Sequence, residues 1–464
     1  MNPRRLYWAV LLLASCWPGS LLAQTQPRPG KGSTCAQDCK SPQLKPLACS
    51  PLLRFPIFTP TAGSSGARLK NPLSDSKDTL YIIAMGDSVV WGNGLYPNDT
   101  FMYKFGHDVA DRTGRNVQVV FYAHSGARFD LIDDYTSTLY FDAQGKYIGD
   151  ISSERPTTEE QAECAAQQYP QAEILVMDGC INEVGATEIA LPFPLNFTNP
   201  DEIVESTSGC GTRWPEFLKD NVLTKFDKAT VVVLNYYEVV SQASKPLVEQ
   251  AGARAEQANA DAGLSQAVGT LDDQRLTLLK KSGLTTKKAK TRIAPVAEPN
   301  ALELHAETSD QKVIDWSANS RAFLVTSQNC EIAAVNIANG LQNSTPCPKA
   351  AHYDPNIEPI VPPVPMQATQ GSRTILAAPA PYPWPANYSY GAIDTHLWYL
   401  PIPKSREYED YGDQEKRCKA EFNLLSEKDY LTCIWDPMGH PNVPGAESYR
   451  QGLVDALGIA WKTD

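Results

Sequence analysis

The chain has 464 residues, of which 42% are hydrophobic, and its formal net charge is −12 at pH 7. A chain of this length and composition can bury a large core and is long enough for more than one domain. The negative charge would repel an extended phosphate backbone, so the composition argues against nucleic acid as a partner.

The N-terminus has the pattern of an export signal. Arg4 and Arg5 precede an apolar stretch over residues 6–17, and Ala23 is a small residue at a suitable cleavage point. The apolar stretch is shorter than the about 20 residues that a membrane-spanning helix needs, and no later segment qualifies. The sequence therefore predicts a signal peptide over residues 1–23, no transmembrane segment, and a secreted or extracytoplasmic protein.

A lipoprotein signal is the alternative interpretation of the same stretch. Leu13-Ala14-Ser15 stands directly before Cys16 and resembles a lipobox. A lipid on Cys16 would tether the mature protein to the cell envelope instead of releasing it. In both interpretations we expect a mature chain without a membrane-spanning helix.

The 11 cysteines of the chain predict disulfides. With Cys16 set apart, the others form an even set, which in an exported chain favours disulfides over metal ligands. Cys330 with Cys347 and Cys418 with Cys433 are close in sequence and are the first pairs we expect. The sequence contains no Cys-x-x-Cys and no His-x-x-x-His. We therefore expect no metal and no other cofactor.

The segment after the signal has the composition of a linker. Residues 24–75 are rich in Pro, Gly, Ser and Lys and show little periodicity. This composition predicts an extended N-terminal arm, which disulfides would pin, rather than an element of the core. The folded domain is expected to occupy residues 76–464.

Short apolar runs, each bounded by polar or Gly-containing turns, recur along the first part of this domain. Continuous runs of this length, separated by segments with helical potential, are typical of strands buried on both faces of a parallel sheet. They predict an α/β fold with a central parallel sheet. The runs are Leu80–Met85, Val117–Tyr122, Ile174–Met177 and Thr230–Leu234.

The rest of the domain contains two insertions and three further elements. The Ala-, Gln-, Leu- and Lys-rich stretch predicts a helical insertion over about 245–310, and a helix is expected over 312–339. Residues 345–390 are crowded with Pro and Tyr, which predicts a long surface loop. Within that loop only 374–377 resembles a strand. The last helix is expected over 445–457, where apolar residues fall on one face.

The residues directly after the apolar runs are the most informative part of the sequence. In a parallel α/β sheet, ligands bind beyond the carboxyl ends of the strands, so these residues are expected to face one common edge. They include several groups suited to acyl chemistry, and they occupy 86–94, 123–127, 178–183 and 235–237.

Ser88 is the candidate nucleophile. A serine hydroxyl is weak until a base takes its proton, and the tetrahedral intermediate then needs donors for its oxyanion. Ser88 lies on a Gly-flanked turn and can supply its own backbone N–H, Gly126 can supply a second, and the Asn182 side-chain amide a third. His440, on a turn just before the last helix, is the candidate base.

At these four positions the chain resembles the SGNH, or GDSL-type, hydrolase family. The family's signature blocks contribute Ser, Gly, Asn and His in that order, and they match Ser88, Gly126, Asn182 and His440. The resemblance implies a three-layer α/β/α sandwich of flavodoxin-like type. It also implies an esterase or lipase that forms an acyl-enzyme.

Two positions depart from the family pattern. The acid after Asn182 is Glu183, where the family usually has Asp. The family also places an Asp three residues before the His, whereas Asp436 lies four residues before His440. A turn at this point still allows Asp436 to orient His440 as the third catalytic residue. The backbone carbonyl of Trp435 is the alternative group for this role.

Several residues have a competing interpretation. His396 and His124 are the other candidate bases, but the first lacks the terminal-helix context and the second is expected to line the pocket or satisfy a buried hydrogen bond. Cys180 invites the role of a thiol nucleophile, although we expect it to be paired, with Cys210 as the suggested partner. Asn182 also suits a helix cap. Three aromatic residues fit either a sugar-stacking platform or, more often, the core: Trp91, Tyr236 and Tyr237.

The sequence thus predicts an exported serine ester hydrolase that acts on a small-molecule or polymer-borne ester, such as a lipid or an acylated carbohydrate. The alternative from another class is a binding or adhesion protein that keeps the fold without turnover. The ester itself is not predicted, because the loops expected to form the pocket carry the least pattern.

Overall fold

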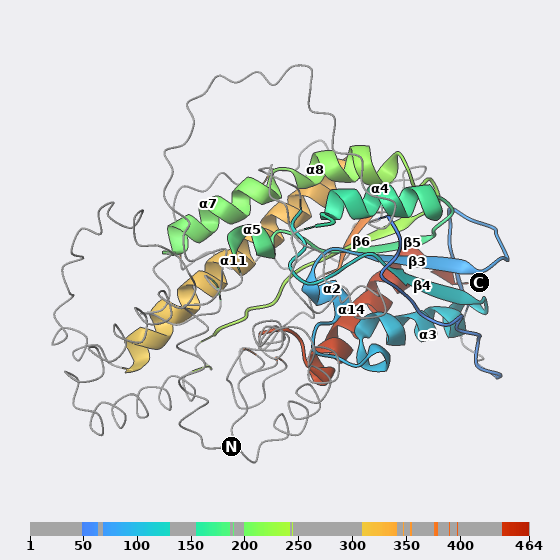
Figure 1. Ribbon diagram of the computed structural model, residues 1–464, viewed down its shortest axis with the longest axis horizontal. Coiled ribbons are helices and arrows are strands. Elements are labelled where there is room, and N and C mark those ends of the chain that lie inside the picture. The colour runs from blue at the N-terminus through green and yellow to red at the C-terminus, as the bar shows by residue number, and fades with distance from the viewer. Residues whose placement is uncertain are drawn as a thin grey trace, which may run out of the picture.

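The computed structural model shows a mixed α/β protein built around a six-stranded sheet of mostly parallel strands (Figure 1). The predicted signal peptide, most of the helical insertion and most of the Pro-rich loop lie outside the residues that the structure describes. The described residues are 49–63, 68–129, 155–185, 189, 199–241, 244, 309–340, 347, 353–354, 375–378, 389, 397 and 439–463.

The sheet has the strand order β1-β4-β3-β5-β6-β7. Strand β1 is antiparallel to β4, and every other neighbouring pair is parallel. The four predicted runs are strands, and the second ends one residue earlier than predicted. The strands are β1 (Leu53–Arg54), β3 (Leu80–Met85), β4 (Val117–Phe121), β5 (Ile174–Met177), β6 (Thr230–Leu234) and β7 (Ile375–Ala378).

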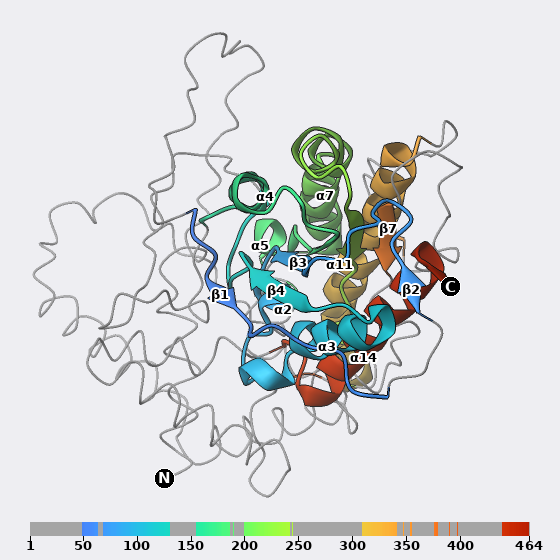
Figure 2. The ribbon, with the colours of Figure 1, turned by 90° about the vertical axis from the view of Figure 1, so that its right-hand side faces the viewer.

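Helices cover both faces of this sheet, as the two views show (Figures 1 and 2). Neighbouring residues of a strand point to opposite faces, so Ile82 and Ile83 belong to different core clusters. The Ile82 face packs against α3 and α14, and the Ile83 face packs against α4, α8 and the C-terminal part of α11. These helices are α3 (Phe101–Thr113), α4 (Thr158–Gln168), α8 (Trp214–Glu216), α11 (Ser309–Ala338) and α14 (Val443–Ala460).

The remaining elements are short or lie at the ends of the sheet. Helix α7 packs along α11, and the small strands β2 and β8 pair antiparallel beside the main sheet. These elements are α2 (Ser88–Trp91), the 3-10 helix η1 (Pro97–Asp99), α5 (Ile181–Val184), α7 (Pro200–Gly211), the π-helix η2 (Phe217–Leu223), β2 (Leu69–Lys70) and β8 (Lys462–Thr463).

Side-chain caps explain where several helices begin. Thr157 and Glu160 form a capping box before α4, each side chain accepting from the other residue's backbone N–H. Asn199 and Glu202 form the same motif before α7. Asn442 accepts a hydrogen bond at the start of α14 from a backbone N–H of the first turn. Polar residues in these loops therefore set the ends of helices whose apolar faces reach the sheet.

The N-terminal arm differs from its prediction. Its described residues, 49–63 and 68–75, are pinned by a disulfide between Cys49 and Cys164, but some of them belong to the core. Phe55 and Phe58 are 3% and 4% exposed and pack in the cluster beneath the sheet. The expectation that the arm contains no core element is therefore wrong for these residues. Phe55 and Phe58 lie in a Pro-containing stretch without a periodic apolar pattern, so the sequence did not indicate their burial. They are buried because β1 pairs with β4 at the edge of the sheet.

Two further disulfides join segments near the carboxyl end of the sheet. Cys330 pairs with Cys347 and Cys180 with Cys210, as the sequence suggested. The expected pair of Cys418 with Cys433 lies outside the described residues. Within the described part of the chain, no helix is long and apolar enough to cross a bilayer.

The topology creates one place where a ligand crevice is expected. From β3 the chain moves to β4 on one side and then returns to β5 on the other side. In open α/β sheets, the crevice forms at the carboxyl ends of the strands where the direction of winding changes. Here that place lies between the ends of β3 and β5, directly before Ser88 and Asn182.

Candidate active site

The turn that carries Ser88 is built for a close approach to a neighbouring strand. It follows β3 with Gly86 at φ +119, and a Cβ at that position would lie 1.9 Å from the Asp178 carboxylate. Only glycine fits there. Asp87 caps α2 by accepting a hydrogen bond from the Val89 N–H at 2.9 Å. Ser88 is therefore the first residue of a short helix at the edge of the sheet.

His440 reaches this serine from the far end of the chain. Its Nε2 lies 2.6 Å from the Ser88 Oγ, although 352 residues separate the two in sequence. This distance is within the range that proton transfer from a nucleophile to a general base requires. The Tyr237 hydroxyl donates to the carbonyl of Gly439 at 2.6 Å. That bond ties the histidine turn to the segment after β6.

Asp178, directly after β5, is hydrogen-bonded to the turn that carries Ser88. Its two carboxylate oxygens accept from the backbone N–H groups of Asp87 at 2.7 Å and Val90 at 3.2 Å. Burial, followed by the nearby Asp87 carboxylate, raises the pKa of Asp178 well above its usual value. The Asp178 side chain thus binds the turn on both sides of Ser88.

Asp87 is buried as well and has a second partner. The Tyr236 hydroxyl donates to its carboxylate. Burial raises the pKa of Asp87, and the hydrogen bond from Tyr236 opposes that shift. Burial also raises the pKa of Tyr236 well above its usual value, so the phenol keeps its proton and remains a donor. Tyr236 is therefore a support beneath the site.

The candidate oxyanion donors Gly126 and Asn182 come from neighbouring segments. Gly126 has φ +78, a conformation that favours glycine. The Asn182 Nδ2 donates to the carbonyl of Ala127 at 2.8 Å. This bond uses one of the two amide hydrogens, so the other is left as a donor. Asn93, in the nucleophile segment, also donates to the Ser125 Oγ at 2.7 Å.

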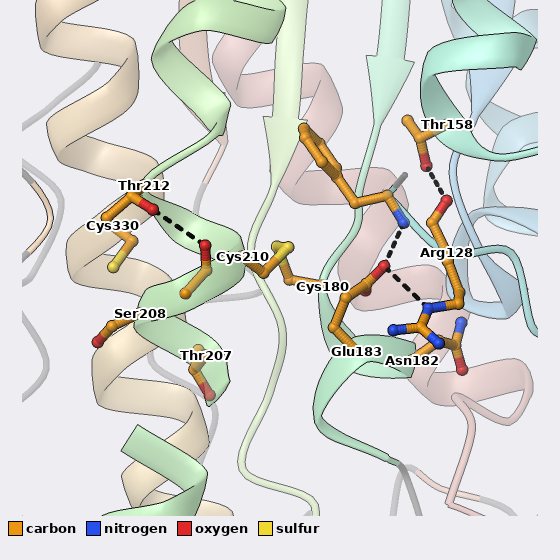
Figure 3. Close-up of a disulfide and its surroundings, with 12 residues drawn as sticks. Arg128, Thr158, Cys180, Asn182, Glu183, Thr207, Ser208, Cys210, Thr212 and Cys330 are labelled. Atoms are coloured by element: carbon orange, nitrogen blue, oxygen red, sulfur yellow. Dashed lines mark hydrogen bonds and ion pairs between the residues drawn. A yellow bond between two sulfur atoms is a disulfide. The ribbon is translucent and has the colours of Figure 1, made fainter. Parts of the chain in front are cut away.

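The start of α5 determines where Asn182 lies. Cys180 precedes the helix at φ 87, and among the described residues it is the one non-glycine with a positive φ. Its sulfur is bonded to Cys210 of α7 (Figure 3). Cys180 is therefore a disulfide partner and not a thiol nucleophile. The disulfide anchors an uncommon backbone conformation two residues before the amide.

Some of the other candidates from the sequence have structural contacts, and the rest lie outside the described residues. His124 is buried, and its ring nitrogens contact the backbone carbonyls of Ser125 and Pro156, each at 2.9 Å. Burial lowers its pKa, which suits a structural histidine. Tyr236 and Tyr237 are buried supports rather than a stacking platform, and Trp91 packs edge-on against Phe121. The structure does not describe Asp436, Trp435 and His396.

Sequence reasoning missed three supports of the site, namely Asp178, Asn93 and the Tyr237 hydroxyl. A signal existed for Asp178, because it comes directly after an apolar run, where functional groups of parallel sheets gather. Asn93 and Tyr237 also lie in segments that follow apolar runs, but their contacts join separate segments, and a single sequence does not predict which residues pair. The roles of Ser88 and His440 in chemistry remain predictions that this geometry supports.

Comparisons of the chain with protein-family models, with curated proteins and with solved structures found no match. Within the described residues, no group of three or more His, Cys, Asp or Glu side chains is placed to hold a metal ion. What bears on function is therefore the geometry of the site together with the motif resemblance.

Proposed function

We propose that the chain is an exported serine ester hydrolase of the SGNH type. One observation carries the proposal: Ser88 Oγ and His440 Nε2 lie 2.6 Å apart at the carboxyl edge of a parallel sheet. A serine hydroxyl next to an imidazole is the arrangement that makes serine nucleophilic. The 6% exposure of Ser88 limits water access to the nucleophile.

The reaction follows from these groups. His440 takes the Ser88 proton as the hydroxyl oxygen attacks the ester carbonyl, and a tetrahedral intermediate forms. The backbone N–H groups of Ser88 and Gly126 and the Asn182 amide donate to its oxyanion. The intermediate collapses, His440 protonates the departing alcohol, and an acyl-enzyme remains. Water, deprotonated by His440, then releases the acid and restores Ser88.

The strand order supports the finer description of the fold. The five parallel strands, numbered along the chain, are ordered second, first, third, fourth and fifth across the sheet. This is the flavodoxin-like order. We therefore propose the three-layer α/β/α sandwich that the motif resemblance implies, with the site at the change in winding direction.

Two parts of the proposal rest on the resemblance and the sequence alone. Asp436 is proposed to orient His440, with the Trp435 carbonyl as the alternative. Export is proposed from the N-terminal signal pattern, and the disulfides are compatible with an oxidising compartment. Retention at the envelope through a lipid on Cys16 is the alternative to release.

The substrate is proposed to be a lipid ester or an acylated carbohydrate, taken as a small molecule or from a polymer. The test is hydrolysis of a panel of short-chain, long-chain and acetylated-sugar esters by the oxidised, purified chain and by its Ser88→Ala variant. We expect turnover of at least one class by the wild type and none above background by the variant. Equal hydrolysis by both proteins would refute the serine mechanism.

A further inference from the structure

The Glu183 carboxylate is a charged group buried next to the candidate oxyanion amide. It follows Asn182 in α5, and its side chain is 5% exposed. Its Oε1 accepts from the Phe129 N–H at 2.5 Å. The same oxygen lies 3.7 Å from the Arg128 Nε (Figure 3). Within the described residues, its Oε2 accepts no hydrogen bond. The carboxylate is therefore incompletely compensated.

The Glu183 contacts act on the segment that carries Gly126. Asn182 holds this segment through the Ala127 carbonyl, and Glu183 holds it through the Phe129 N–H. Two consecutive residues of α5 are thus hydrogen-bonded to the backbone of residues 127–129. The two hydrogen bonds set the distance between the candidate oxyanion donors Gly126 and Asn182, because one donor lies on each side of the contact.

The far side of the same segment is also held. The Phe129 ring packs against Trp214 at 4.6 Å and Phe217 at 4.9 Å between ring centroids. The side chain of Phe129 is thereby fixed in the core, and its backbone N–H is presented to Glu183. A change in the strength of that hydrogen bond is therefore passed along the backbone toward Gly126, where Asn182 holds the Ala127 carbonyl.

The environment of Glu183 places its ionisation near neutral pH. Burial raises its pKa to about 7, although Arg128 and the Phe129 N–H favour the charged form. Asp87, across the site in the nucleophile turn, adds a smaller effect that raises the pKa further. Among the described residues, Arg128 and Asp87 are the charged groups that shift the pKa of Glu183. A buried carboxylate that changes charge near neutrality is more typical of functional sites than of structural ones.

We propose that Glu183 is a positioning residue that keeps the Gly126 and Asn182 donors correctly spaced when it is charged and relaxes them when it is protonated. This inference rests on the proposed esterase function and adds a pH control to the same site. A charged acceptor makes a shorter and stronger hydrogen bond than a neutral one. Loss of the charge also removes the attraction to Arg128.

The chain offers a matched control at the opposite end of the same strand. Glu173, directly before β5, is 4% exposed and pairs with Arg115 through two hydrogen bonds of 3.0 and 2.7 Å. It also accepts from the Asn71 side chain at 2.9 Å. Glu173 is thus another buried glutamate with an arginine partner, but it lies far from the candidate donors along the strand.

The test compares kcat/KM of the wild type, Glu183→Gln and Glu173→Gln from about pH 5 to about pH 9 on a neutral ester. Taking the ratio of wild type to variant cancels the ionisation of His440. For Glu183→Gln we expect a ratio of about tenfold above about pH 8 that falls to about one below about pH 6, because protonated Glu183 and Gln are alike in charge. For Glu173→Gln we expect a ratio that does not change with pH.

A second measurement does not need activity. With selective ¹⁵N labelling of phenylalanine, the Phe129 amide resonance is expected to titrate near about pH 7 in the wild type and not in Glu183→Gln. If the wild type hydrolyses no ester, the proposed function fails, and this titration still decides whether Glu183 controls the segment. A pH-independent ratio for Glu183→Gln, or a Phe129 amide that does not titrate, would overturn the inference.

Discussion

Buried acidic side chains have different partners at the two ends of the parallel sheet. At the amino end, the side chains of Arg115 and Asn71 both donate hydrogen bonds to the Glu173 carboxylate. At the carboxyl end, Asp178 lies within reach of another buried carboxylate, Asp87, and burial raises the pKa of both. The first arrangement stabilises the fold, whereas the second makes folding oppose the charged state of its acids.

On the proposed function, the carboxyl end is where the protein tolerates a loss of stability in return for activity. Unpaired or like-charged buried groups destabilise a protein and are retained where chemistry needs them. Asp178 accepts hydrogen bonds from the turn that carries Ser88, and Glu183 accepts one from the segment next to Gly126. The carboxyl end therefore combines backbone control with buried charge, and substitutions at the two ends are expected to separate activity from stability.

Replacing the candidate nucleophile Ser88 should separate activity from stability more than any other substitution. Ser88→Ala is expected to lower turnover on the order of 10⁶-fold, because the attacking oxygen and the acceptor of the acyl group are lost together. Thermal unfolding should change little, since the hydroxyl is the group removed. Steady-state ester hydrolysis and calorimetry on the same preparation check both halves. A variant with more than one hundredth of wild-type turnover would contradict the assignment of Ser88.

The oxyanion amide should have the next largest effect. Asn182→Ala removes one donor to the developing charge and is expected to lower kcat by about 10² to 10³-fold. KM should change little, because the donor acts mainly in the transition state. The measurement is kcat and KM on the best ester of the panel. An unchanged kcat would leave Asn182 with only its bond to the Ala127 carbonyl.

The tie between Tyr237 and the histidine turn should have a smaller effect. Tyr237→Phe removes the hydroxyl that donates to the Gly439 carbonyl. A net hydrogen bond of about 1 kcal/mol corresponds to a loss of about fivefold in kcat, if all of it positions His440. Kinetics at the pH optimum give the number. Tyr236→Phe, which removes a hydroxyl from Asp87 instead, separates the two supports.

The last expected effect is on the pH dependence of stability rather than on turnover. Glu183 has an ordinary pKa of 4.5 and a folded-state pKa of about 7. Between these pH values the folded chain keeps a proton that the unfolded chain has lost, so raising the pH favours unfolding. The loss is on the order of 3 kcal/mol in all.

Denaturant unfolding from about pH 4.5 to about pH 8 measures this loss. The free energy of unfolding of the wild type should fall relative to that of Glu183→Gln over this window. Glu173→Gln should be less stable than the wild type by about 1 to 3 kcal/mol. A Glu183→Gln variant that loses stability relative to the wild type as the pH rises would contradict the sign.

The sequence predicted the strands of the sheet well because they are buried on both faces. Leu80–Met85, Ile174–Met177 and Thr230–Leu234 are continuous apolar runs that stop at polar turns, and the structure has the same bounds. The four motif positions were also identified by their place after these runs and before the last helix. Local patterns were sufficient to predict the strands, whereas the catalytic roles of the four motif positions stay predictions.

Long-range pairing was not predictable in the same way. The Cys49–Cys164 disulfide spans 115 residues, and the burial of Phe55 depends on an edge strand of two residues. The hydrogen bonds of Asp178 to the turn that carries Ser88 could be predicted only if β5 were known to lie beside β3. These features follow from tertiary contacts between segments that carry no mutual signal in a single sequence.

The central claim is that Ser88 is a nucleophile activated by His440. Reaction of the oxidised chain with a fluorophosphonate probe, followed by peptide mapping, tests it most directly. We predict a single adduct on Ser88 and labelling slowed by about 10³-fold or more in His440→Ala. No adduct on Ser88 in the correctly oxidised protein would contradict the account and favour a binding or adhesion protein on this fold.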